Sequence, residues 1–391
     1  MQIIYIGAFR FPIYDAAAAR VLNIARAFRD NGHTVRFISW GGCYCEEDKD
    51  ENGIYKYDKF EYYITDELDL KGSILDKITT LFHKGKKSLE VLKNINDAID
   101  LVIAYNADYR LTKTLLSFCN ARGIKFANDI TEWYEPHELY FFERVPYYLN
   151  MKSLQHKVKN KIVISSYLNY YFEESNNLLL PPLCDPSEKK WSKTVVDERI
   201  ESFDGVTLFY AGTPAKKDCV HNCINVINRL ANEGKKVRFI ILGITKEVYL
   251  CKYADKLDDK SLNDAILFLG RVSQQDIPAY YKYADFMVLL REPTRKNMAG
   301  FPTKVAESIT AGIPVITNNT SDLSKYINEG KTGFILEDEK VETLYRLLKT
   351  KVLAMDQHRI DLIKRNVRTN AFAFNCHCYK TIIERFLNNL K

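Results

Sequence analysis

The clearest chemical signal in the chain is the segment Gly300 to Ile316, which reads Gly-Phe-Pro-Thr-Lys-Val-Ala-Glu-Ser-Ile-Thr-Ala-Gly-Ile-Pro-Val-Ile. It predicts a helix that starts at a proline, stops at a glycine and precedes a buried strand. The first backbone amides of a helix lack partners within it and carry partial positive charge, so they can bind a phosphate. A carboxylate one turn later can accept hydrogen bonds from sugar hydroxyls. The predicted contacts with such a ligand are Gly300, Phe301, Pro302, Thr303, Lys304 and Glu307.

Three other loops directly follow predicted strands. Open parallel sheets bind their ligands beyond the carboxyl ends of the strands, which is where these loops lie. The loop that opens at Gly212 contains Lys216 and Lys217, which would act as point charges on a diphosphate. Taken alone, this loop fits a solvated charged turn better. Arg271 and Val272 follow the next such strand, where the backbone would bind a nucleobase while the arginine faces either phosphate or solvent. Arg291 begins a third loop, which adds further cations.

A cluster of acids and aromatic residues follows a predicted strand in the first half of the chain. Asp129, Glu132 and His137 lie there among tryptophan and tyrosine, a combination suited to stacking on a sugar and handling an acceptor hydroxyl. The alternative is a helix start capped by Asp129. Arg20 begins beside the first strand-to-helix loop and would reach the same cleft, although lone helical arginines are more often solvated. The predicted catalytic residues are Lys217, Asp129, Glu132 and His137.

The elements that must position these residues alternate between strands and helices. The segment 2–7 reads as a strand, 15–31 as a helix with apolar residues at helical spacing, and 34–39 as a second strand. This order is a crossover unit of a parallel sheet, and it restarts near residue 206 after a polar stretch. We therefore expect two doubly wound domains, 1–185 and 190–370, with a C-terminal helix within 371–391 that crosses back to the first.

Composition limits the class of protein. The chain has 391 residues, 46% of them hydrophobic and 27% charged, which fits an ordered globular protein. A net charge of +6 suits an anionic ligand or a membrane surface as well as weak nucleic-acid contact, and we expect no nucleic-acid partner. No apolar run is long enough to span a bilayer, which predicts a cytoplasmic protein.

Cysteines and one basic stretch leave alternatives open. Nine cysteines fit reduced thiols better than a disulfide framework, and Cys43-Tyr-Cys45 and Cys376-His-Cys378 lack the paired spacing of a zinc site, so we expect no metal. The lysine-rich segment 71–94 fits a helix on the inner face of an anionic membrane equally with a solvated helix whose apolar side is in the core.

The string Ala299-Gly-Phe-Pro-Thr-Lys-Val-Ala-Glu307 and the residues that follow it resemble the donor-binding motif of family 4 glycosyltransferases. Phe268-Leu-Gly-Arg-Val272 is similar to the nucleobase loop of that family, and Gly212 to Asp218 to its phosphate loop. The usual first glutamate of the motif is Ala299 here, and the usual arginine after the glycine is Thr213. The resemblance implies a GT-B fold of two facing Rossmann-like domains.

The resemblance also implies an activity: retaining, metal-independent transfer of a hexose from a nucleotide diphosphate sugar, with a uridine diphosphate sugar as the default. The donor is a co-substrate and no cofactor is expected. The acceptor would be a saccharide or a lipid-linked saccharide in surface polysaccharide or glycoconjugate synthesis. A nicotinamide-dependent oxidoreductase is less favoured, because Gly7-Ala-Phe-Arg-Phe-Pro holds a single glycine. A catalytically weak, nucleotide-sugar-binding scaffold subunit remains the alternative, because of Ala299 and Thr213.

Overall fold

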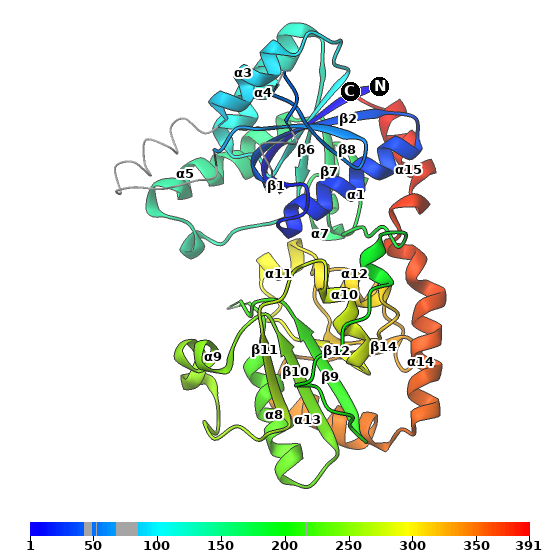
Figure 1. Cartoon of the computed structure of the whole chain (residues 1–391). Helices are drawn as coiled ribbons and strands as arrows, with labels where there is room; N and C mark the ends of the chain where they lie inside the picture. Colours follow the sequence, from blue (N-terminus) through cyan, green and yellow to red (C-terminus); the bar gives the residue numbers. More distant parts are fainter. Residues whose placement is uncertain (43–48, 52, 68–84, 216) are drawn as a thin grey trace. The chain divides into compact units, whose positions relative to one another are not determined.

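The computed structural model describes the whole chain except residues 43–48, 52, 68–84 and 216. The chain forms two compact units (Figure 1): unit 1, which joins Met1–Leu183 to Cys376–Lys391, and unit 2, which is Cys184–Asn375. Each unit is built around its own largely parallel sheet. The predicted α/β class with two parallel-sheet domains is confirmed.

Unit 1 contains an eight-stranded sheet with the order β3-β4-β2-β1-β5-β6-β7-β8. Its strands are parallel except for the β3–β4 pair. The strands are β1 (Gln2–Phe11), β2 (Thr34–Gly42), β3 (Tyr55–Tyr57), β4 (Phe60–Ile64), β5 (Leu101–Tyr105), β6 (Lys125–Ile130), β7 (Asn160–Val163) and β8 (Asn176–Leu179). The helices are α1 (Ala16–Asp30), α3 (Lys86–Asn94), α4 (Tyr109–Arg122), α5 (Phe141–Leu149), α6 (Gln155–Lys157), α7 (Ser166–Tyr171) and α15 (Lys380–Asn388).

The side-chain alternation of β1 creates two cores, one on each face of this sheet. Ile3 and Tyr5 pack with residues of α1 and α15. Ile4 and Ile6 pack on the opposite face with residues of α3 and α4. The predicted helix over 15–31 is α1, whose N-cap Asp15 accepts a hydrogen bond from the Ala18 amide at 2.8 Å.

The last helix belongs to unit 1, as predicted. Ile383, Phe386 and Leu387 of α15 are buried, and this helix contacts α1 and β8. The Asn176 side chain on β8 donates to the Phe386 carbonyl at 3.0 Å. The crossing helix is shorter than the predicted range 371–391, because residues 371–375 belong to unit 2.

Unit 2 contains a six-stranded parallel sheet with the order β11-β10-β9-β12-β13-β14. The strands are β9 (Val206–Ala211), β10 (Val237–Leu242), β11 (Ile266–Gly270), β12 (Phe286–Leu289), β13 (Val315–Asn318) and β14 (Gly333–Leu336). The helices are α8 (Val220–Asn232), α9 (Lys246–Tyr253), α10 (Ile277–Tyr280), α11 (Arg295–Ala299), α12 (Thr303–Thr310), α13 (Val341–Thr350) and α14 (Gln357–Asn370). This is the doubly wound order, in which the direction of chain progression reverses between β9 and β12.

Part of the lysine-rich segment 71–94 lies outside the described residues. Its described part, α3, buries Leu92 and Ser88 and exposes Lys86, Lys87 and Lys93. That arrangement fits the alternative of a solvated helix packed on the core. Among the described residues, no helix is both long and apolar enough to cross a bilayer.

Candidate anion-binding site in unit 2

The candidate site lies at the switch point of the unit 2 sheet, where the loops after β9 and β12 meet. A parallel sheet places these loops at the same edge, because both follow the carboxyl ends of neighbouring strands. Asp218 in the first loop and Arg291 in the second form an isolated β-bridge. The Cys219 amide donates to the Leu290 carbonyl at 2.8 Å, so backbone bonds also join the two loops.

The centre of this edge is the buried carboxylate of Asp218. It accepts hydrogen bonds from the Tyr210 hydroxyl at 2.6 Å and from Arg291 Nε at 2.7 Å. Lys304 Nζ, from the first turn of α12, reaches the same carboxylate at 3.2 Å. The Asp218 side chain is 0% exposed, whereas that of Lys304 is 19% exposed. The Asp218 carboxylate therefore forms ion pairs with both Arg291 and Lys304. Of these two cations, Lys304 is the more exposed to solvent.

The charges of this cluster fix the ionisation of Asp218. Burial alone would raise its pKa, but Lys304 and Arg291 hold the pKa of this carboxyl well below its usual range. The three side chains together carry a single net positive charge. A buried group with uncompensated positive charge at a loop edge is a site for an anion.

Two glycines bring backbone amides close to the lysine. Gly212 has φ +114°, and a Cβ atom there would lie 2.7 Å from Lys304 Cε. Gly243 has φ +118°, and a Cβ atom there would lie 2.5 Å from the Gly212 carbonyl carbon. The Gly212 amide donates to the Leu242 carbonyl at 2.8 Å, which fixes the loop to β10. A Cβ atom at Gly212 would displace the end of the Lys304 side chain, and one at Gly243 would push the Gly212 backbone away.

Helix α12 completes the site with its amino end. Pro302 is the N-cap, one residue before the first helical position where the sequence placed it, and it supplies no side-chain cap. Thr303 and Lys304 therefore present the unpaired amides of the first turn. Glu307 is partly buried, and its carboxylate makes no hydrogen bond or ion pair with another residue that the structure describes. Burial raises its pKa, against the opposing effect of Lys190 and Lys304.

The other predicted contacts in unit 2 fall into different environments. Arg291 is 5% exposed and forms an ion pair with Asp218. It therefore helps to position Asp218 and does not contact a ligand directly. The ring of Phe301 is buried against Tyr326 and Phe374, which leaves only its backbone for a ligand, as at Gly300. Arg271 is exposed and Val272 half-buried, directly after β11.

The structure describes one of the two lysines in the loop after β9. Lys216 lies outside the described residues. Lys217 is half-buried and has interaction partners within the structure. It directly precedes Asp218, so it stands beside the cluster by its place in the chain.

In unit 1 the residues predicted to bind the acceptor sugar do not form one solvent-accessible cluster. Asp129 lies inside β6 and is fully buried, so it is not a helix cap. Its carboxylate accepts from Arg20 at 2.8 Å and from the Tyr5 hydroxyl at 2.5 Å. Arg20 is itself 4% exposed, which corrects the expectation of a solvated or cleft-facing arginine. The pair is a structural ion pair, and this disfavours contact between Asp129 and an acceptor.

Glu132 and His137 lie beyond the carboxyl end of β6, as the sequence placed them. Glu132 is half-buried and hydrogen-bonds with Tyr134, whose pKa rises through burial and the charge of Glu132. His137 is exposed in a 3-10 turn, Pro136–Glu138. These two remain candidates for handling an acceptor, and Lys217 belongs to the other unit.

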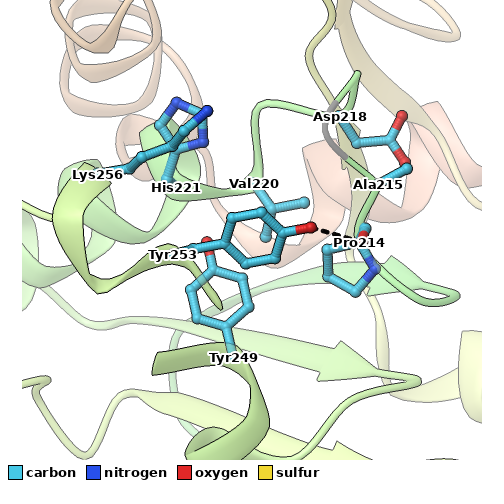
Figure 2. Close-up of a pocket in the computed structure, with 8 residues that line it drawn as sticks. All are labelled: Pro214, Ala215, Asp218, Val220, His221, Tyr249, Tyr253 and Lys256. Atoms are coloured by element: carbon cyan, nitrogen blue, oxygen red, sulfur yellow. Dashed lines mark hydrogen bonds between the residues drawn. The ribbon is translucent and has the colours of Figure 1, made fainter. Parts of the chain in front are cut away.

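A hollow on the α9 side of the 212–218 loop is not the ligand site. Figure 2 shows Tyr249 and Tyr253 side by side next to Pro214, with His221 and Lys256 along the edge. The Tyr253 hydroxyl donates to the Pro214 carbonyl at 3.2 Å. The space between these residues does not admit a water molecule, so they serve as packing that supports the loop.

Residues 198–368, which contain this whole site, match the protein family described as glycosyl transferases group 1. Unit 2 thus contains a region that matches the group 1 glycosyl transferases. The predicted family resemblance is therefore confirmed, and the matched region includes both the loop at Gly212 and the motif that ends at Ile316.

Two sequence relatives of this chain are bacterial. One, from Salmonella typhimurium, bears the name of a colanic acid biosynthesis glycosyltransferase, WcaL, and is 25% identical over 130 residues, which are 33% of this chain and 32% of that protein. An uncharacterized 41.2 kDa protein in the cps region of Klebsiella pneumoniae is 25% identical over 128 residues, 31% of this chain and 32% of that protein. The match thus spans about a third of the length of each relative.

Solved structures match the chain over its whole length and confirm the GT-B fold. Sucrose-phosphate synthase from Thermosynechococcus elongatus has a TM-score of 0.72 at 14% identity, covering 99% of this chain and 97% of that chain. Anabaena Alr3699/HepE in complex with UDP and glucose has a TM-score of 0.69 at 14% identity, covering 100% of both chains.

Three residues of this candidate site were not predicted from the sequence: Asp218, Tyr210 and Gly243. The signal for Asp218 was present, because it ends the loop that holds the two lysines and its partner begins the loop after β12. If β9 and β12 had been predicted as neighbouring strands, the contact between Asp218 and Arg291 could have been inferred. Gly243 directly follows β10 as Gly212 directly follows β9, and Gly270 is the last residue of β11.

Proposed function

We propose that the chain is a retaining glycosyltransferase that moves a hexose from a nucleotide diphosphate sugar to a saccharide or lipid-linked saccharide. A uridine diphosphate sugar is the first choice of donor, and surface polysaccharide or glycoconjugate synthesis is the setting. Family membership supports the activity class. The complex of the structural neighbour HepE with UDP and glucose, and the name of the relative WcaL, support the donor and the setting.

The observation that carries this proposal is the placement of Lys304. Asp218 binds its ammonium group at 3.2 Å, the Gly212 backbone lies close to its side chain, and Lys304 itself belongs to the first turn of α12. The usual arginine of the phosphate loop is Thr213 here, and its side chain instead donates to the Gly243 carbonyl at 3.3 Å. Lys304 would thus supply a cation in place of that arginine.

The site would act mainly on the leaving group. The acceptor oxygen forms a bond to the anomeric carbon while the bond from that carbon to the phosphate oxygen breaks. The departing phosphate oxygen takes the acceptor proton, which places attack and departure on the same face of the sugar and retains its configuration. Lys304, Lys217 and the α12 amides would stabilise the charge that grows on the diphosphate. Glu307 would accept hydrogen bonds from the ribose diol.

A scaffold subunit that binds nucleotide sugars without turnover is the second candidate. The observation that favours it is Ala299, which stands at the position of the usual sugar-facing glutamate and is 0% exposed at the end of α11. Because Ala299 is buried, a glutamate placed there could reach a ligand only if the surrounding residues moved.

A two-step experiment tests the proposal. Thermal-shift screening of nucleotide sugars should show stabilisation by at least one donor, and incubation with that donor should release free nucleotide diphosphate through transfer or slow hydrolysis. Binding without release across a broad acceptor panel would favour the scaffold. If no nucleotide sugar stabilises the protein, the donor assignment is wrong.

A further inference from the structure

A buried asparagine lies at the carboxyl end of β13, next to the loop after β12. Asn318 is the last residue of β13 and is 3% exposed. Its Oδ1 atom accepts a hydrogen bond from the Arg291 amide at 2.9 Å, and its Nδ2 group donates to the Arg291 carbonyl at 2.7 Å. One side chain therefore pairs with both backbone groups of one residue. We call these two hydrogen bonds the Asn318 clamp.

The clamp lies beyond the point where the ladder between β12 and β13 ends. The last residue pair of that ladder is Leu289 with Thr317, and the Thr317 hydroxyl donates to the Leu289 carbonyl at 2.6 Å. After Asn318 the chain turns, since the Thr320 amide donates to the Asn318 carbonyl at 2.9 Å. The Asn318 side chain therefore takes over the pairing that the β13 backbone no longer provides to Arg291.

The clamp depends on the chemistry of an asparagine. A carboxamide carries a hydrogen-bond acceptor and a donor in one plane, so it can pair with the N–H and the C=O of the same residue. Aspartate would offer only acceptors, and leucine, which is similar in size, would offer neither group. Because Arg291 is 5% exposed, loss of the clamp would leave two buried backbone groups without these partners.

The residue that the clamp holds is the one that organises the anion site. The Arg291 guanidinium binds one oxygen of Asp218 at 2.7 Å, and the other oxygen of that carboxylate lies 3.2 Å from Lys304 Nζ. The position of the guanidinium depends on the backbone that carries it, and Asn318 fixes that backbone. A continuous chain of hydrogen bonds and ion pairs thus joins the end of β13 to the first turn of α12.

We propose that Asn318 is a positioning residue of the anion site. Through Arg291 and Asp218 it keeps the Lys304 ammonium group where the diphosphate of the donor would bind. Asn318 does not contact the ligand itself, because its side chain is buried and both its oxygen and its nitrogen are engaged in the clamp. The inference rests on the proposed function, since it assigns a role in the same nucleotide-binding site.

Calorimetric titration with UDP tests this role of Asn318. The variant Asn318→Leu keeps the approximate size of the side chain and removes both hydrogen bonds. It should bind UDP about three- to tenfold more weakly than the wild type, because Lys304 loses its fixed position. The matched control is Asn319→Leu, which changes an exposed neighbour in the same loop and should bind like the wild type.

A double-mutant cycle separates positioning from a general loss of stability. In a Lys304→Met background, Asn318→Leu should have no further effect on UDP affinity, because the residue that it positions is absent. A purely structural asparagine would lower the urea midpoint of unfolding and leave the UDP affinity of the folded protein unchanged. Asn318→Ser, which can keep one hydrogen bond, repeats the cycle with a smaller loss of stability.

The outcomes also separate this inference from the proposed function. No binding of UDP to the wild type would contradict the proposed function and this inference with it. If the wild type binds UDP and Asn318→Leu binds it equally well, only the role of Asn318 is overturned. An equal loss of affinity with and without Lys304 would overturn that role too, because the effect of Asn318 would then not act through the lysine.

Discussion

At the residue scale, the chemistry of unit 2 depends on how one buried carboxylate holds two cations. Asp218 contacts Arg291 at 2.7 Å and Lys304 at 3.2 Å, and the two cations differ in burial. Arg291 needs the carboxylate because it is inside the protein. Lys304 is near the surface and could exchange the carboxylate for a phosphate. The same anion thus stabilises the fold through one partner and positions a ligand contact through the other.

The variant Asp218→Asn should destabilise unit 2 by about 3–5 kcal/mol, because it leaves the Arg291 charge buried without its partner. Urea unfolding measures this loss. The double variant Asp218→Asn/Arg291→Met should recover part of it, because the unpaired charge is gone. Equal stability of the wild type and Asp218→Asn would show that the ion pair does not matter for folding.

Lys161 of β7 is a second buried charge, and it lacks a carboxylate partner among its hydrogen bonds. It is 0% exposed and donates to the Val158 carbonyl and, at 2.6 Å, to Ser175 Oγ. Burial lowers its pKa from 10.5 to about 7. Above that pH the folded state holds fewer protons at this site than the unfolded state does.

The stability of unit 1 should therefore rise as pH increases from about 7 towards 10.5, by up to about 1.4 kcal/mol per pH unit from this residue alone. Lys161→Met should remove this contribution and be neutral or stabilising at pH 7, because Met buries no charge. The comparison is urea unfolding across this pH range, with the exposed Lys159→Met as control. An unchanged pH slope in Lys161→Met would contradict the assignment.

At the element scale, the site depends on how closely the strand ends approach one another. Gly243 at the end of β10 lets the Gly212 loop lie against it, and Gly212 in turn lets Lys304 of α12 lie against the loop. The backbones of β10 and the Gly212 loop are thus in direct contact, and the Lys304 side chain of α12 lies against that loop. The geometry of the anion site follows from these approaches.

Gly243→Ala should weaken nucleotide binding about tenfold or more, because the new methyl group would displace the Gly212 carbonyl and the loop with it. Gly234→Ala is the matched control: its φ of +73° is also positive, but no atom lies within 4 Å of the added Cβ. Both variants carry backbone strain, which is greater at Gly243 because its φ of +118° lies outside the left-handed helical region whereas the +73° of Gly234 lies close to it. Calorimetric titration with UDP distinguishes the two, and equal weakening by both variants would rule out the proposed role of the contact.

The sequence predicted the elements that have strong periodicity and left out those that do not. Helix α1 and the alternation of strands and helices followed from apolar spacing, and the motif after Gly300 placed α12 within a residue of its start. The short strands β3, β4, β8 and β14 were not predicted, because polar residues or a glycine interrupt their apolar pattern, whereas the equally short β12 is apolar throughout.

The site could be predicted in its loops but not in its contacts. Thr303, Lys304 and Glu307 followed from helix chemistry. The roles of Asp218 and Asp129 depend on partners far away in the chain: Arg291 is 73 residues from Asp218, and Arg20 is 109 residues from Asp129. Strand order is needed to identify such pairs, and without it Asp129 was predicted as a catalytic residue, with a helix cap as the alternative.

At the scale of the whole molecule, the chain leaves unit 1, builds unit 2 and returns through α15. The returning helix supplies Ile383, Phe386 and Leu387 to the core of unit 1. Unit 1 therefore cannot be complete until the end of the chain is present, whereas unit 2 is one continuous segment.

Phe386→Ala should lower the stability of unit 1 by about 3–5 kcal/mol and leave unit 2 unaffected. Hydrogen exchange resolved by peptide should show faster exchange in β1, β8 and α1 but not in β9 to β14. Ile382→Ala, on the same helix but 38% exposed, is the control and should have a small effect. Uniform loss of protection in both units would contradict their independence.

The most direct test of the whole account is a calorimetric titration of UDP into the wild type, Lys304→Met and the exposed-lysine control Lys340→Met. The side chain of Lys340 is 75% exposed, remote in sequence from the site and paired with Asp338. We predict that Lys304→Met weakens UDP binding about 10- to 100-fold, the value of a charge-assisted contact, while Lys340→Met binds like the wild type. Equal affinity in all three proteins, or no binding of UDP to the wild type, would contradict the assignment of this edge of unit 2 as the site of the nucleotide diphosphate.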